Sequence, residues 1–183
     1  MRAMRVCVFG AGAVGGNIAV MLARAGADVS VLVRGATLQA VRARGLELHT
    51  PDGVVRANVR ASDDPRELGE QDAVLVTVKQ TALTASAPAI TALLGRDTPA
   101  VFLQNGIPWW YFHGQGNADE GKRIPELDPG DVLWNTVGPQ RAVGGVTSSP
   151  CTVVEPGVVK LAGKNGTMVF GEPDGSMSPR LMA

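Results

Sequence analysis

The chain has 183 residues, 45% of them hydrophobic, which suits one globular domain with a buried core. Its 17 basic and 17 acidic side chains give a formal net charge of zero, so small-molecule partners are expected rather than nucleic acid. No apolar run approaches membrane-spanning length, so we expect no signal peptide, no anchor and no membrane partner.

The first 34 residues have the pattern of a strand, a helix and a second strand. Residues 6–9 form a short apolar run that ends at a glycine, as a strand buried on both faces should. Apolar residues recur at helical spacing over residues 13–25, and Gly26 supplies a left-handed stop. A β-branched run follows at 29–33, which predicts a right-handed parallel βαβ unit.

The alternation of helices and strands continues to about residue 105. The expected elements are a helix at 37–44, a hairpin of strands 46–50 and 54–59 around Pro51-Asp52-Gly53, a strand at 73–78, a helix from Lys79-Gln80 to about Leu94-Gly95, and a strand at 100–104 capped by Asn105-Gly106. We expect the hairpin to be peripheral to the sheet.

Residues 113–130 predict a long surface loop, because they are rich in glycine, proline and charge and have no helical or strand period. The aromatic residues 109–112 are expected to pack this loop against the domain. Short β-rich segments return at 145–147, 151–155, 158–161 and 168–170, separated by Pro156-Gly157 and Asn165-Gly166 turns. We expect these segments to be antiparallel strands that close one edge of the sheet.

The predicted fold class is therefore α/β: a Rossmann-type parallel sheet with helices on both faces, extended at one edge by antiparallel strands. Residues 1–176 are expected to form this domain, and residues 177–183 to begin a linker. The sequence contains no internal repeat and no low-complexity tract.

A glycine fingerprint opens the first predicted helix. It reads Gly10-Ala11-Gly12-Ala13-Val14-Gly15, directly after a strand and inside the βαβ unit. In that setting the glycines allow a tight turn, close approach of a pyrophosphate and close packing of helix on strand. The helix N-terminus then meets the anion with free N–H groups and a positive dipole end. The alternative is a merely glycine-rich turn.

Three further residues stand where strands end at the same edge. Arg34 lies where an NAD site would place Asp or Glu, and a guanidinium there favours the 2′-phosphate of NADP. Lys79 could add a second positive charge, and Asn105 could bridge a cofactor ribose and a polar substrate. An ordinary surface arginine, a solubilising lysine and a generic Asn-Gly turn are the corresponding structural alternatives.

The histidines and cysteines offer little chemistry. His49 and His113 have no carboxylate or cysteine at a spacing typical of a catalytic pair or metal site, so we interpret both as structural. Cys7 and Cys151 lie in apolar runs without the spacing of a zinc site or disulfide framework. We therefore expect no metal and a reducing, cytoplasmic location.

Taken together, these residues resemble the ketopantoate reductase family, also called 2-dehydropantoate 2-reductases. The resemblance covers essentially the whole chain. Beyond the fingerprint, it rests on Val33-Arg34-Gly35, Val78-Lys79-Gln80, Gln104-Asn105-Gly106-Ile107-Pro108-Trp109-Trp110 and Gly171-Glu172-Pro173-Asp174-Gly175.

The resemblance implies reduction of 2-dehydropantoate by NADPH in pantothenate synthesis. Carried over by position, Gly10 to Gly15 would hold the pyrophosphate, Arg34 and Lys79 the 2′-phosphate, and Asn105 both cofactor and substrate. Family members continue into a helical C-terminal domain that brings the proton-donating lysine, so that domain is an expected partner of this chain. None of Lys79, Lys122, Lys160 and Lys164 can be assigned that role, and no catalytic residue is predicted here.

Three functions remain open at this point. The first is the cofactor-binding half of a ketopantoate reductase, catalytically incomplete by itself. The second is a noncatalytic NADPH-binding module or truncated remnant, and the third is a reductase of a different 2-oxo acid. In each case an uncovered apolar face is expected to favour self-association, such as a homodimer.

Overall fold

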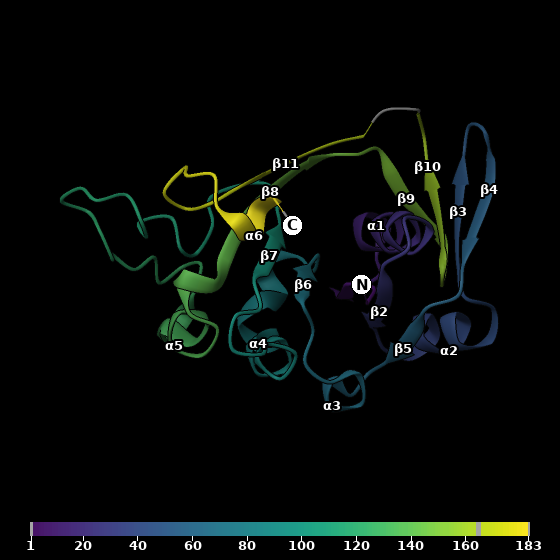
Figure 1. The fold of residues 1–183 in the computed structure, drawn as a ribbon, viewed down its shortest axis with the longest axis horizontal. Coiled ribbons are helices and arrows are strands. Elements are labelled where there is room, and N and C mark those ends of the chain that lie inside the picture. Colours follow the sequence, from purple (N-terminus) through teal and green to yellow (C-terminus); the bar gives the residue numbers. More distant parts are fainter. Residues whose placement is uncertain (1, 164–165, 183) are drawn as a thin grey trace.

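The computed structural model describes residues 2–163 and 166–182. Its main sheet has seven strands in the order β11-β8-β7-β6-β1-β2-β5, and all neighbours are parallel except β11 and β8 (Figure 1). The strands are β1 (Arg5–Phe9), β2 (Asp28–Leu32), β5 (Arg60–Ser62), β6 (Ala73–Val76), β7 (Ala100–Leu103), β8 (Ala142–Ser148) and β11 (Thr167–Gly171). The predicted α/β class with a mostly parallel sheet is confirmed.

The helices connect these strands. They are α1 (Ala13–Arg24), α2 (Gly35–Arg44), α3 (Pro65–Leu68), α4 (Gln80–Thr91), α5 (Val132–Thr136) and α6 (Pro179–Met182), with 3-10 turns at Pro129–Asp131 and Pro139–Arg141. The predicted βαβ unit is therefore present, with helix bounds within a residue or two of those expected. The short elements β5, α3 and α5 were not predicted.

A second sheet of four strands covers α1. Its order is β4 (Gly53–Ala57), β3 (Leu46–Thr50), β10 (Val158–Leu161) and β9 (Cys151–Glu155). Figure 1 shows α1 lying between this small sheet and the main sheet. The contact is close enough that a Cβ on Gly16 would lie 2.7 Å from Val159 Cγ2.

This arrangement corrects two expectations. The hairpin of β3 and β4 is not merely peripheral, because β10 pairs with β3. The hairpin is thus part of the four-stranded sheet that covers α1. The segments β9 and β10 were expected on the edge of the main sheet, but they join the hairpin instead. Only β8 and β11 extend the main sheet, and β8 runs parallel to β7. The Gly166 turn residue is described, whereas Asn165 lies outside the described residues.

The core lies on both faces of the main sheet. In β1, Val8 packs with the apolar side chains of α1, α2 and the small sheet, while Cys7 and Phe9 pack with those of α4 and α5. This alternation follows from the two-residue period of a strand. Complete burial of a side chain such as Val8 contributes about 1.5–3 kcal/mol, so both layers help to fix β1 at the centre.

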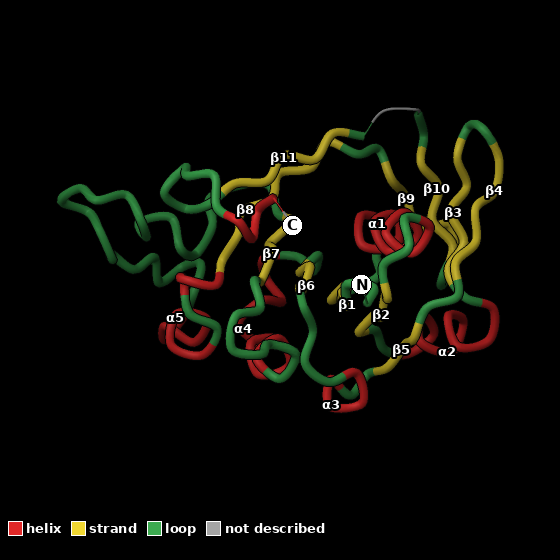
Figure 2. The backbone as a smooth tube through the Cα atoms, viewed as in Figure 1, coloured by secondary structure: helices red, strands yellow, loops and turns green. Residues whose placement is uncertain are grey.

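Figure 2 shows a long stretch of loop between β7 and α5, as the composition of residues 113–130 predicts. Two tryptophans hold its start: Trp109 and Trp110 are buried and pack on Phe102 of β7, with ring centroids 5.7 and 4.8 Å away. At its end the buried carboxylate of Asp128 accepts hydrogen bonds from the backbone N–H groups of Leu133 and Trp134, both at 2.9 Å. These contacts satisfy two of the N–H groups in the first turn of α5 that have no intrahelical partner.

Candidate functional site

The glycine fingerprint forms the turn between β1 and α1, and each glycine has a different geometric reason. Gly10 has φ +94°, and a Cβ there would lie 2.8 Å from Val78 Cγ1. A Cβ on Gly15 would lie 2.0 Å from the carbonyl oxygen of Gly10, so helix and turn touch through backbone atoms. A Cβ on Gly12 would meet nothing within 4 Å, because this side of the turn is open. The backbone of Gly12 is therefore accessible to a ligand.

Thr77, which directly follows β6, supports this turn through hydrogen bonds, and this role was not predicted from the sequence. Its hydroxyl donates a hydrogen bond to the carbonyl oxygen of Gly10 and lies 3.2 Å from that of Phe9. Its backbone N–H also donates to Phe9, at 3.1 Å. A hydroxyl residue following a buried strand at the carboxyl edge of the sheet was the available signal.

A cleft of about 570 Å³ lies beside the turn, at the carboxyl ends of β1 and β2. We call it the glycine-turn cleft. Its lining residues are Phe9, Gly10, Ala11, Gly12, Leu32, Val33, Arg34, Thr37, Asp63, Val78, Ala82, Ala85, Ser86, Ala89, Val153, Gly157, Val158 and Val159. The first turn of α1 has no acidic residue and leaves its N–H groups without intrahelical partners, so this end of the cleft suits an anion.

The predicted phosphate-binding residues do not all lie in this cleft. Arg34 is exposed, lines the cleft and immediately precedes α2. Lys79 is exposed just beyond Val78, at the start of α4, and does not line it. Neither side chain has a hydrogen bond or ion pair with another described residue. Ala13 and Val14 lie in the first turn of α1, and Gly15 is buried beneath them.

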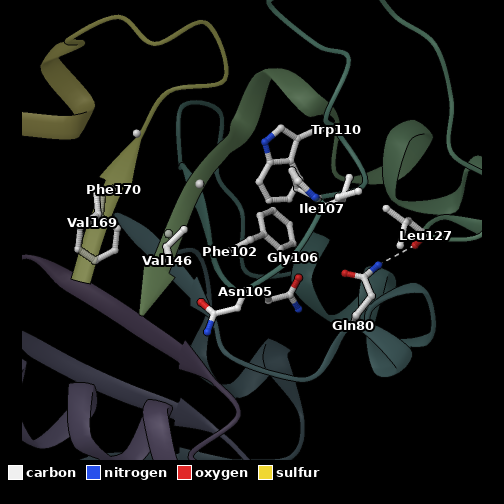
Figure 3. A pocket seen from close by; sticks show the side chains of 15 residues that line it. Gln80, Phe102, Asn105, Gly106, Ile107, Trp110, Leu127, Val146, Val169 and Phe170 are labelled. Atoms are coloured by element: carbon white, nitrogen blue, oxygen red, sulfur yellow. Dashed lines mark hydrogen bonds between the residues drawn. The ribbon is translucent and has the colours of Figure 1, made fainter. Parts of the chain in front are cut away.

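Asn105 lies in a separate groove of about 470 Å³ between the ends of β7 and β8 (Figure 3). Its amide exchanges two hydrogen bonds with the backbone of Thr147, donating at 3.1 Å and accepting at 3.2 Å. On the opposite wall, Gln80 Nε2 donates to the carbonyl oxygen of Leu127 at 2.9 Å and ties the long loop to α4. Asn105 thus keeps one N–H and one lone pair for a ligand.

The rim of this groove, which we call the β7–β8 groove, is apolar and exposed. Ile107, Val146, Val169 and Phe170 have exposed fractions of 61%, 57%, 62% and 42%. Figure 3 shows Val146, Val169 and Phe170 on neighbouring strands at one side of the groove. Such a cluster is typical of a surface that contacts a ligand or another protein unit.

The histidines have carboxylate partners that their sequence spacing did not suggest. His49 Nε2 lies 2.5 Å from Glu47 Oε1 within β3, and His113 Nδ1 lies 3.6 Å from Glu120 Oε1 in the long loop. The hydrogen bond with His49 lowers the pKa of the Glu47 carboxyl, and a hydrogen bond from Arg56 lowers it further. Neither pair lines the glycine-turn cleft or the β7–β8 groove.

The remaining chemistry within residues 2–163 and 166–182 is sparse. No group of three His, Cys, Asp or Glu side chains is arranged there to hold a metal ion. Nor does that part of the chain contain a helix long and apolar enough to cross a membrane. Burial raises the pKa of the Cys7 thiol to about 11, so this sulfur stays protonated at neutral pH. The glycine-turn cleft and the β7–β8 groove contain the predicted binding residues Arg34 and Asn105, respectively.

Residues 6–175 match the family model described as "Ketopantoate reductase PanE/ApbA". The chain belongs to the ketopantoate reductase family. A 2-dehydropantoate 2-reductase of Mesorhizobium japonicum is 43% identical over 180 residues, which are 97% of this chain and 55% of the relative. The resemblance inferred from the motifs is therefore confirmed.

Several solved structures share the fold of this chain. A protein of Ralstonia solanacearum MolK2, described as a candidate ketopantoate reductase, superposes with a TM-score of 0.93 at 39% identity, covering 99% of this chain and 56% of that one. D-Mandelate dehydrogenase, solved with NADH and anilino(oxo)acetate, gives a TM-score of 0.73 at 23% identity, covering 92% of this chain and 48% of that one, which shows the fold alone. The chain spans about half the length of the relatives that it matches.

Proposed function

We propose that this chain binds NADPH in the glycine-turn cleft and forms the cofactor-binding half of a reductase that converts 2-dehydropantoate to pantoate, a step of pantothenate synthesis. One observation carries the proposal: the open backbone at Gly12 borders the same cleft as the guanidinium of Arg34, which pairs with no other residue among those that the structure describes. At Gly12 the missing side chain leaves room for a phosphate beside the backbone, and the Arg34 guanidinium supplies a positive charge nearby. This combination fits a dinucleotide that carries an additional phosphate.

Each residue then has a defined task. The N–H groups of the first turn of α1 bind the pyrophosphate, and Gly12 lets it approach the backbone. Arg34 pairs with the 2′-phosphate through charge-assisted hydrogen bonds, and Lys79, exposed beside the cleft, adds positive charge to the same region. Thr77 acts as a positioning residue, because its hydroxyl holds the Gly10 carbonyl oxygen. NADPH, when bound, supplies the hydride.

Asn105 is the proposed substrate-binding residue. Its free N–H can donate to the oxo or carboxylate oxygen of a 2-oxo acid, while Thr147 fixes the orientation of its amide. Reduction of a ketone also requires a group that protonates or stabilises the developing alkoxide. Lys122 pairs with Asp119 in the long loop, Lys160 lies on β10, and Lys164 lies outside the described residues.

We therefore assign the proton donor to the part of the longer relatives that this chain does not span. That part would also cover the exposed apolar rim of the β7–β8 groove. The expected result is NADPH binding with negligible turnover by these 183 residues. Robust NADPH oxidation by this chain alone, with 2-dehydropantoate or with another 2-oxo acid, would contradict this assignment of the proton donor. Both cysteines are free thiols, which supports the proposed cytoplasmic location.

Nucleotide titration tests the cofactor assignment. We expect NADPH to bind more tightly than NADH, and Arg34→Ala to weaken NADPH about 10- to 100-fold, because a charge-assisted pair contributes roughly 1.5–3 kcal/mol. Binding is followed by the fluorescence of the reduced nicotinamide. Arg24→Ala is the matched control, since Arg24 is an exposed arginine at the opposite end of α1. Equal binding of both nucleotides, or unchanged NADPH affinity in Arg34→Ala, would refute the role of Arg34.

A further inference from the structure

The acidic residue Asp63 lies at the rim of the glycine-turn cleft. It directly follows β5, which pairs in parallel with β2 so that Ser62 stands opposite Leu32. The backbone N–H of Val33 donates to the carbonyl oxygen of Ser62 at 2.9 Å, and this bond holds the ends of the two strands together. Asp63 and Arg34 therefore line the same cleft from neighbouring strands.

The polar groups around Asp63 are already engaged. The Ser62 hydroxyl donates to the Glu67 carboxylate at 2.5 Å. Asp64 caps α3 by accepting from the backbone N–H of Arg66 at 2.9 Å, and it also pairs with the Arg66 guanidinium at 2.8 Å. The Asp63 carboxylate, in contrast, is exposed and has no hydrogen bond or ion pair within the described residues, and none with Arg34. Among the acidic side chains at residues 63–67, the Asp63 carboxylate is therefore the one that remains available to a ligand.

The same cleft also has an apolar lining that suits a flat heterocycle. Val33 borders the cleft together with the small side chains Ala82, Ala85 and Ala89, which lie on one face of α4. A carboxylate only accepts hydrogen bonds, so Asp63 can meet the donors of a nucleotide but not its phosphates. If Arg34 holds the 2′-phosphate, the base extends from the ribose along this apolar wall, and its outer edge carries the 6-amino group.

We propose that Asp63 accepts a hydrogen bond from the 6-amino group of adenine and makes the cleft selective for adenine over hypoxanthine dinucleotides. The inference rests on the proposed NADPH-binding function and names a base-recognition residue for it. Hypoxanthine carries an oxygen at position 6, which would face the Asp63 carboxylate acceptor to acceptor. This contact would be unfavourable because neither group donates.

The test compares NADPH with its hypoxanthine analogue, which has the same nicotinamide and the same phosphates. Fluorescence titration should show that the unchanged chain binds NADPH about 10- to 100-fold more tightly than the analogue. Asp63→Ala should bring the two affinities within about threefold of each other, and Asp63→Asn should favour the analogue relative to the unchanged chain, because its amide can donate to the 6-oxo group. Asp28→Ala, an exposed aspartate at the start of β2, should keep the preference.

The preference ratio within each variant is the decisive quantity, since a general loss of affinity cancels from it. Thermal unfolding midpoints of the variants check that the fold is unchanged, as expected for an exposed residue. Equal binding of NADPH and the analogue by the unchanged chain, or a preserved preference in Asp63→Ala, would overturn the role of Asp63 while leaving NADPH binding intact. Absence of binding by either nucleotide would overturn the proposed function and this inference together.

Discussion

Replacement of Gly15 by alanine probes the packing of α1 on the turn that precedes it. The new methyl carbon would lie 2.0 Å from the carbonyl oxygen of Gly10 and 2.4 Å from Thr77 Oγ1. The oxygen belongs to the backbone and is itself held by the Thr77 hydroxyl, so it cannot simply rotate away. The helix and the strand must therefore separate, and the small sheet on the other side of α1 opposes this movement.

The magnitude follows from the size of this overlap. Forcing an additional methyl group into a packed core generally costs about 1–3 kcal/mol, and a backbone clash belongs at or above the upper end of that range. Near 3 kcal/mol, the midpoint of thermal unfolding of a chain of this length should fall by about 6–12 °C. Gly12→Ala is the matched control, because its methyl group would meet nothing within 4 Å.

Circular dichroism during heating measures both variants. Gly12→Ala should change the midpoint little, since the loss of a glycine N-cap and the reduced entropy of the unfolded chain nearly offset each other. The same variant should weaken NADPH binding, because the methyl group projects where the pyrophosphate is proposed to lie. Equal midpoints for Gly15→Ala and the unchanged chain would refute the packing argument, and so would equal losses in the two variants.

Two further predictions concern stability and association. Hydrogen bonds from neighbouring arginines hold the pKa of the Asp72 carboxyl far below its usual range, so its contribution to stability is present above the unfolded-state pKa and is lost as the pH falls. Asp72→Asn should lower the free energy of unfolding by about 1 kcal/mol at pH 7 and less below about pH 4, measured by urea unfolding; an equal loss at both pH values would contradict this. The exposed apolar rim of the β7–β8 groove should cause self-association at micromolar concentration, reduced in Val169→Lys; sedimentation of the unchanged chain as a clean monomer would count against it.

Much of the main sheet could be predicted because its signals are local. The apolar run 6–9, the glycines after it and the helical spacing up to Gly26 act within a single βαβ unit, and the structure places β1, α1 and β2 there. The glycine fingerprint also indicated where the cleft lies. Gly10 and Gly12 belong to a single turn, whose backbone geometry depends on these local residues. The position of Arg34 beside the cleft could be predicted because ligands bind where parallel strands end, while its role in binding stays a prediction.

The remaining features depend on partners that the local sequence does not specify. Residues 151–155 and 158–161 have a strand pattern, but nothing in it indicates pairing with β3 rather than with the main-sheet edge. The strand Arg60–Ser62 has a single hydrophobic residue, and its pairing with β2 comes from the sheet edge rather than from its own pattern. The role of Thr77 likewise becomes visible only when the turn that it supports lies beside it.

The sandwiching of α1 between two sheets has a consequence for the order of folding. The small sheet joins residues 46–57 with residues 151–161, and a hydrogen bond from Arg44 to Glu155, 111 positions apart, spans the same connection. Such non-local pairing must overcome the entropy of closing a long loop, so it should follow the local βαβ unit. Because Val158 and Val159 line the glycine-turn cleft, the cleft should be completed late, and a bound nucleotide would stabilise the contacts that form last.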